Sequence, residues 1–304
     1  MFALSTAWNA ARFEDGAKIA EEIQKLGFRN LELNFSLSAG MVKDIERYAL
    51  SCGMAITSLH NYCPTPEEFS RNDAMPDCFS LSSIDDDERR KAVDYTKRTI
   101  STAKMLKSRA VVLHSGRVEI EDKTRQLIAL YNKGLGKNSL YIDMLEGFMR
   151  ERKLKSPAYF SQILKSFEEL SSYAIEHGII LGIENRFYYR EIPSFEEFGV
   201  IFERFKNKNL AYWHDVGHAF IHEKLGFMPA CALLENYGKY LCGMHVHNIK
   251  DLADHQALTF GDFDLAQLKP YVKPDTIIVL EIHKQAQAED IKKSVAYLEE
   301  ILHA

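Results

Sequence analysis

Short apolar runs alternate along the chain with longer segments in which apolar residues recur every three or four positions. Short apolar runs are typical of buried strands, and the three-to-four-residue spacing is typical of helices that bury one face. The apolar runs predict eight strands, at 2–7, 28–33, 54–60, 109–114, 179–187, 210–215, 240–247 and 276–282. Helical patterns are found between or after them at 14–26, 41–50, 86–106, 157–176, 194–205, 228–237 and 289–302.

This alternation predicts an α/β protein with a parallel sheet, because a pair of parallel strands needs a helical crossover. Eight such strands can close, so the fold class we expect is a (β/α)8 TIM barrel. The length of 304 residues slightly exceeds the roughly 250 residues of a typical barrel of this kind. We therefore expect a single domain over 1–304 that carries an insertion.

The segment 115–156 has an irregular pattern, in which Lys and Arg are frequent and apolar residues form helix-like clusters. We interpret it as a helical insertion after strand four. Because it follows His114, at the C-terminal end of that strand, we expect it to cover the mouth of the barrel. Pro157 suits the first turn of a helix, so it is expected to begin the next barrel helix. The polar stretch 61–85 is too long for a simple connection and is interpreted as an active-site loop.

The composition argues against several classes of protein. The net charge of −5 gives no attraction to nucleic acid phosphates, so a small neutral or anionic substrate is the expected partner. The five cysteines are scattered without a Cys-x-x-Cys pair, which favours a reducing compartment over a disulfide framework or a zinc ribbon. With no leader pattern and no long apolar window, we expect a soluble cytoplasmic protein that does not enter a membrane. Homo-oligomerisation is left open.

Metal-competent side chains stand where four successive predicted strands end: Glu184, Asp215, His245 or His247, and Glu281. Barrel enzymes build their active sites at this end of the strands. A lone carboxylate there could be a solvated strand end, but burying four such groups unpaired would cost roughly several kcal/mol each. Three carboxylates and one imidazole suit Mn²⁺, Mg²⁺, Co²⁺ or Zn²⁺ in a catalytic site. His245 and His247 point to the same face of their strand, so the pattern leaves the choice between them open.

Four segments resemble the xylose isomerase-like superfamily, which includes sugar isomerases, sugar epimerases and AP endonucleases of the endonuclease IV type. They are Ile183-Glu184-Asn185-Arg186, His214-Asp215-Val216-Gly217-His218-Ala219, Gly243-Met244-His245-Val246-His247-Asn248, and His255 followed by Gly261-Asp262-Phe263-Asp264. The resemblance favours His245 over His247 and implies one divalent ion, with a second ion as an open alternative, on the ligands Glu184, Asp215, His245 and Glu281. The substrate contacts that we predict are His60, His114, His218, Arg186, His247 and His255.

By this resemblance, the expected function is a metal-dependent isomerase or epimerase of a sugar, sugar phosphate or polyol. Glu184 and Glu281 would be its catalytic acid and base. One departure is that the epimerases carry a further Glu just beyond Asn-Arg-Phe, where this chain has Tyr188 and Tyr189. The alternative is an endonuclease IV-like phosphodiesterase acting on abasic DNA, which the acidic net charge disfavours. A barrel that binds a sugar without turnover is disfavoured by the intact carboxylate set.

Overall fold

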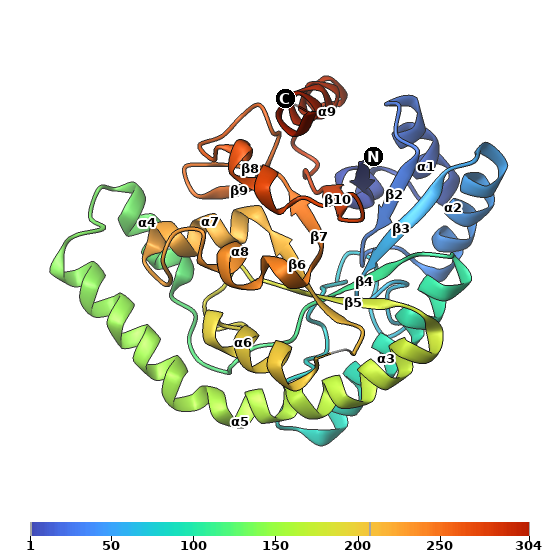
Figure 1. Cartoon of the computed structure of the whole chain (residues 1–304). Helices are drawn as coiled ribbons and strands as arrows, with labels where there is room; N and C mark the ends of the chain where they lie inside the picture. The colour runs from blue at the N-terminus through green and yellow to red at the C-terminus, as the bar shows by residue number, and fades with distance from the viewer. Residues whose placement is uncertain (1, 207, 304) are drawn as a thin grey trace.

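A computed structural model of the chain describes residues 2–206 and 208–303. In this part of the chain, parallel strands form a closed barrel in the order β1-β10-β7-β6-β5-β4-β3-β2 (Figure 1). Each strand lies within its predicted range, so the expected barrel is confirmed. The barrel strands are β1 Ala3–Ser5, β2 Asn30–Leu33, β3 Ala55–His60, β4 Ala110–Leu113, β5 Ile180–Glu184, β6 Leu210–Asp215, β7 Leu241–Val246 and β10 Ile277–Leu280.

Helices surround the barrel, and most of those described start at side-chain caps. The side chains of six residues accept hydrogen bonds from backbone N–H groups in the first turn of an α-helix, as expected of N-caps: Asp15, Ser38, Asp85, Asn138, Ser194 and Asp215. No helix in the described part of the chain is long and apolar enough to cross a membrane. The α-helices are α1 Gly16–Lys25, α2 Ala39–Cys52, α3 Asp86–Met105, α4 Thr124–Asn132, α5 Ser139–His177, α6 Phe195–Arg204, α7 Val216–Leu225, α8 Ala232–Tyr237 and α9 Ala288–His303.

The long helix α5 corrects one prediction. It continues through Pro157, which was expected to start a new helix after an insertion ending at residue 156. Proline inside a helix costs about 3 kcal/mol, but buried side chains hold the helix on both sides of it, with Phe148 before Pro157 and Phe167 after it. Packing therefore overrides the local preference. The first half of α5 belongs to the expected insertion, and the second half is the barrel helix.

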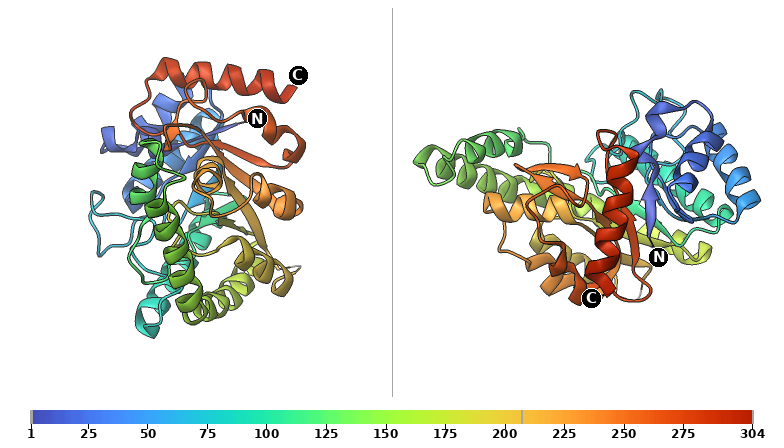
Figure 2. Two further views of the ribbon diagram at one scale, coloured as in Figure 1. Left: turned by 90° about the vertical axis from the view of Figure 1, so that its left-hand side faces the viewer. Right: turned by 90° about the horizontal axis from the view of Figure 1, so that it is seen from above.

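Helix α4 lies at the C-terminal end of the barrel. The Asn132 side chain donates to the backbone carbonyl of Asp251 at 2.7 Å, and the Arg125 guanidinium donates to the Tyr188 hydroxyl at 2.8 Å. Asp251 belongs to the turn of a small antiparallel hairpin, β8 Asn248–Lys250 and β9 Ala253–Gln256, which was not predicted. The right-hand view of Figure 2 shows α4, in green, on the same side as this orange hairpin. The insertion thus contacts loops around the barrel mouth.

Helix α7 was also missed, because its pattern has no polar face. It starts directly after Asp215, whose carboxylate accepts the backbone N–H of His218 at 2.8 Å and so serves as the N-cap. Most of the helix is buried, including Val216, Ala219 and Ile221. Its polar residues, His218, His222, Glu223 and Lys224, are not gathered on one side, so the helix lacks the periodic signal of a surface helix. One strand-tip carboxylate therefore starts a helix at the place where a ligand was expected.

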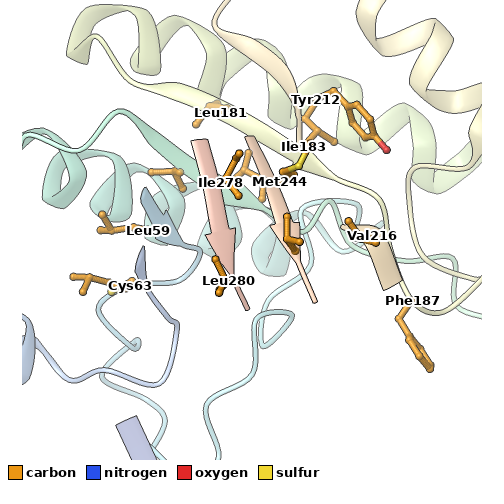
Figure 3. Packing of buried hydrophobic residues seen from close by; sticks show 14 of the residues in the cluster. Leu59, Cys63, Leu181, Ile183, Phe187, Tyr212, Val216, Met244, Ile278 and Leu280 are labelled. Carbon is orange, nitrogen blue, oxygen red and sulfur yellow. The ribbon is translucent and has the colours of Figure 1, made fainter. Parts of the chain in front are cut away.

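Successive side chains along each strand point alternately toward the surrounding helices and into the barrel interior. Outward-facing residues such as Leu59, Leu181 and Met244 pack in the cluster under the surrounding helices (Figure 3). A separate cluster fills the interior, and includes Ala110, Val112, Trp213, Ile277 and Val279. Because side chains alternate along a strand, the next inward positions beyond this interior cluster are the strand tips. The predicted ligands occupy this last inward layer.

Trp213 forms the floor beneath that layer. Glycines on the two neighbouring strands, Gly182 on β5 and Gly243 on β7, leave the room that its indole ring needs, since a Cβ atom at either position would overlap the ring. The Trp213 ring lies 5.2 Å, between centroids, from the imidazole of His245. These three residues therefore support His245 from below.

Gly243→Ala is expected to lower the free energy of unfolding by about 1–3 kcal/mol, because overpacking a filled core forces neighbours to shift. Gly147→Ala is the matched control. Gly147 lies in α5 with open space around its Cα, so the added methyl group should raise helix stability by about 0.5–1 kcal/mol. Chemical denaturation followed by circular dichroism measures both changes. Equal stability of Gly243→Ala and the wild type would contradict the account of the barrel floor.

Candidate metal centre

Four of the predicted residues form one buried cluster at the C-terminal end of the barrel. Glu184 ends β5, Asp215 ends β6, His245 lies on β7 and Glu281 directly follows β10. Each offers one ligand atom, and these four atoms all lie within 4.8 Å of one another. The Nδ1 atom of His245 lies 2.6 Å from Glu184 Oε1, 3.0 Å from Glu281 Oε2 and 3.9 Å from Asp215 Oδ2. We call this set the carboxylate–imidazole centre.

The hydrogen bonds distinguish the two histidines that the sequence left open. His247 Nδ1 accepts the backbone N–H of His255 at 2.8 Å, so its Nε2 carries the hydrogen and donates to Asp215 at 3.1 Å. Both of its nitrogens are therefore engaged by protein groups. His245 instead directs Nδ1 into the cluster. The geometry supports His245 as the candidate ligand. His247 instead orients Asp215 through its hydrogen bond.

A carboxylate that was not among the predicted site residues lies behind His245. Glu32 of β2 is fully buried, and its Oε1 lies 3.0 Å from His245 Nε2. The hydroxyl of Ser58 donates to Glu32 Oε2 at 2.8 Å. A carboxylate that accepts Nε2–H fixes the imidazole so that Nδ1 faces the centre, as carboxylates do behind many metal-binding histidines. Glu32 stands between Leu31 and Leu33 near the end of an apolar run, and this strand-tip position is the signal that could have identified it.

Charge is unevenly compensated at the centre. Burial alone would raise the pKa of Glu184, but His245, His114 and His60 hold it well below its ordinary value. Burial raises the pKa of Glu281 to about 8, with the nearby anions Glu184 and Glu32 adding to the rise against the opposing effect of His245. The cluster thus holds more negative charge than its single imidazole can neutralise.

The remaining predicted histidines lie beside the centre in groups with acidic residues, and two of these groups each contain a pair of them. One combines His60 and His114 with Glu184, and the other combines His218 and His255 with Asp254. In the second group, His218 Nδ1 donates to the carbonyl of Asn185 at 3.0 Å, and His255 Nδ1 donates to the carbonyl of Glu281 at 2.9 Å. Both Nε2 atoms are therefore free to accept, and each lies 3.7 Å from Asp254 Oδ2.

Arg186, predicted to contact substrate, is buried among carboxylates. Its Nη1 donates to Glu184 Oε2 at 2.8 Å, and its Nη2 donates to Glu191 Oε1 at 3.1 Å. Asp77, from the polar loop after β3, lies 3.5 Å from Nη2. Burial lowers the pKa of Arg186, but Glu191, Asp77 and Glu184 raise it by more, so its pKa lies above the ordinary value. Asp77 and Glu191 complete the site and were not predicted from the sequence.

A cavity of about 270 Å³ reaches the centre beside Glu281. Its lining comes mainly from the first two strand tips and from the loop after β10, and includes Asn34, Phe35, Ser36, Lys284 and Gln285. Polar groups therefore face this cavity from several directions. A second cavity, of about 690 Å³, lies between α5 and α6 and contains none of the residues of the carboxylate–imidazole centre.

The chain belongs to the xylose isomerase-like TIM barrel family, whose profile matches residues 20–301. The fold and the arrangement of acidic and imidazole groups at the strand tips agree with this membership. No curated protein sequence matches the chain.

Solved structures with the same fold cover nearly the whole chain at low sequence identity. A D-tagatose 3-epimerase-like protein is 19% identical, with a TM-score of 0.65 over 99% of this chain and 97% of that one. The 3-keto-D-glucoside 4-epimerase from E. coli is 14% identical, with a TM-score of 0.68 over 98% of both chains. An AP endonuclease of family 2 from Brucella melitensis is 15% identical, with a TM-score of 0.65 over 98% of both chains. At these identities, the likeness establishes the fold.

Glu32→Gln is expected to weaken binding of Mn²⁺ or Zn²⁺ by about 10–100-fold, a loss typical when the partner behind a metal-binding histidine is changed. Glutamine keeps the shape of Glu32 but removes its charge beside His245. Isothermal titration with each ion measures the affinity, and circular dichroism checks the fold. Glu22→Gln, on the outer helix α1, is the control and should bind like the wild type. Unchanged affinity in Glu32→Gln would show that Glu32 does not orient the ligand.

Proposed function

We propose that the protein is a divalent-metal-dependent isomerase or epimerase of a small sugar-like molecule. The observation that carries the proposal is the convergence of Glu184, Asp215, His245 and Glu281 at one point inside the barrel mouth. The epimerases among the structures of the same fold support the reaction class. Residues at the ends of several different strands are the usual source of catalytic groups in this fold.

The donor set fits a divalent ion. Because Glu32 takes the Nε2 hydrogen of His245, a neutral imidazole would direct its Nδ1 lone pair at the oxygens of Glu184 and Glu281. Two acceptors in contact require a cation between them, either a proton or a metal ion. Three carboxylates with one imidazole are a ligand set suited to Mn²⁺, Co²⁺, Zn²⁺ or Mg²⁺. We therefore assign these four residues as the ligands.

Two carboxylates of the chain share the proton transfer. A bound divalent ion supplies Lewis acidity, which polarises a carbonyl and its neighbouring hydroxyl and acidifies the adjacent C–H. Glu184 and Glu281 project from β5 and from the end of β10, which are separated in the barrel by β7 and β6. We assign one to remove the proton from carbon and the other to return it from the opposite side. Such a pair interconverts epimers or aldose and ketose.

The polar lining next to Glu281 supports a hydroxyl-rich substrate. Asn34, Ser36 and Gln285 offer both donors and acceptors around the 270 Å³ cavity, and Lys284 adds a positive charge. Phe35 supplies an apolar surface, and its ring lies 5.6 Å, between centroids, from that of His60. Alternating polar and apolar walls suit the two faces of a sugar. A ketose or its phosphate is the substrate class that we assign.

A phosphodiesterase of the endonuclease IV type is the second candidate. The group formed by His218, Asp254 and His255 favours it, since these residues could hold a further ion next to the carboxylate–imidazole centre. Against it stands the net charge of −5, because binding of nucleic acid relies on neutralising phosphates with basic residues. The isomerase proposal is therefore preferred.

The wild type, loaded with Mn²⁺ and incubated in deuterated water with a panel of ketohexoses and their phosphates, is expected to place deuterium on the carbon next to the carbonyl. A carboxylate that takes up the proton can exchange it with solvent before returning it. Glu184→Gln and Glu281→Gln should each lower this exchange by at least about 10²-fold, the scale of general acid–base catalysis. Mass spectrometry and proton NMR follow the label.

His177→Gln is the control, because His177 lies at the C-terminal end of α5, before β5 begins, and should exchange like the wild type. Wild-type exchange in either glutamate variant would remove that residue from the proposed acid–base pair. Cleavage of an abasic-site duplex that is abolished by chelation and in Glu184→Gln would replace the isomerase with the second candidate.

A further inference from the structure

The group of His60, His114 and Glu184 has the composition of a metal site, but another side chain of the protein contacts its ligand atoms. The guanidinium Nη1 of Arg186 donates to both His114 Nε2 and Glu184 Oε2. His60 Nε2 faces the same Glu184 oxygen at 3.8 Å. One nitrogen of Arg186 therefore contacts two of the atoms with which these three residues would hold an ion.

Both ring nitrogens of His114 already contact protein groups. Its Nε2 faces two groups at once, Nη1 of Arg186 and, at 2.8 Å, Oε2 of Glu184. A guanidinium can only donate, so towards Arg186 this nitrogen accepts and the ring hydrogen is on Nδ1. That Nδ1 lies 3.2 Å from Asp77 Oδ1, which accepts it. The Nε2 atom of the His114 ring is thus taken up by Arg186 and Glu184 and is not free for a metal.

Arg186 is held in this place from its other side. Its Nη2 donates to Glu191 Oε1 at 3.1 Å, and Asp77 Oδ2 lies 3.5 Å away. Glu191 is fixed in turn, because its Oε2 accepts the backbone N–H of Tyr188 at 2.8 Å. Only 7% of the Arg186 side chain is exposed. A planar guanidinium bound by several carboxylates cannot leave without exposing buried anions.

We propose that Arg186 is a built-in cation that replaces a metal ion at the His60–His114–Glu184 group. The guanidinium neutralises the outer oxygen of Glu184, while the inner oxygen faces His245 and the carboxylate–imidazole centre. A divalent ion at the same group would meet both a positive charge and an engaged His114 lone pair. The inference rests on the metal centre of the proposed function but not on its reaction. On this proposal, Arg186 limits the number of ions that the chain binds.

The test is the number of Zn²⁺ ions per chain after equilibrium dialysis, measured by inductively coupled plasma mass spectrometry. Arg186→Met, which keeps much of the side-chain length without charge or donors, is expected to bind one ion more than the wild type. Adding His60→Ala to Arg186→Met should return the count to the wild-type value. Arg125→Met is the matched control, since Arg125 contacts the same loop at Tyr188, and should leave the count unchanged.

An equal count in folded Arg186→Met and wild type would overturn the inference. If Arg186→Met does not fold, His60→Ala in the wild-type background decides: an unchanged count supports the inference, and the loss of one ion overturns it. The ion count is measured without substrate. It therefore stays valid even if the deuterium-exchange experiment of the proposed function fails. A wild type that binds no ion, while Arg186→Met binds one, would support the role of Arg186 and remove the metal centre of the proposed function.

Discussion

Repulsion between buried carboxylates is the constraint around which the barrel mouth is built. Glu184, Asp215 and Glu281 converge with their ligand atoms in close proximity, and Glu32 lies fully buried behind His245. Buried charges are tolerated only when they are paired or coordinate a metal. Three of these four carboxylates accordingly have a defined partner: His247 and the start of α7 for Asp215, Arg186 for Glu184, and Ser58 for Glu32. Glu281, whose pKa is raised to about 8, is the least compensated.

The barrel geometry explains why these groups meet. In the register of the sheet, Asp215 pairs with His245 and His245 pairs with Val279, two residues before Glu281. Side chains at alternate positions point inward, so the proposed ligands form the layer immediately above Trp213 and the small residues around it. The Trp213 floor is fully buried, and the strands set the spacing of these side chains. A cation held at this level faces protein on one side and the cavity beside Glu281 on the other.

The strands and the four proposed ligands could be predicted because they depend on local pattern. An apolar run that ends in a charged residue identifies both the strand and its tip. The strand-tip position of Glu32 is visible in the sequence, but its contact with His245 joins strands that are distant in the sequence and could not be predicted. The same holds for the contacts of Arg186 with His114 and Asp77. Helix α7 lacked a polar face, and Pro157 suggested a helix start that the packing of Phe148 and Phe167 overrides. Local signals fail where tertiary contacts outweigh them.

The central claim is that four strand-tip residues bind one divalent ion. Anomalous diffraction from a crystal grown with Mn²⁺, recorded above and below the manganese absorption edge, locates such an ion directly. The account predicts a peak enclosed by the side chains of Glu184, Asp215 and Glu281 and by Nδ1 of His245. A crystal with ordered side chains but no peak there, or with a manganese peak only at His60 and His114, would contradict it.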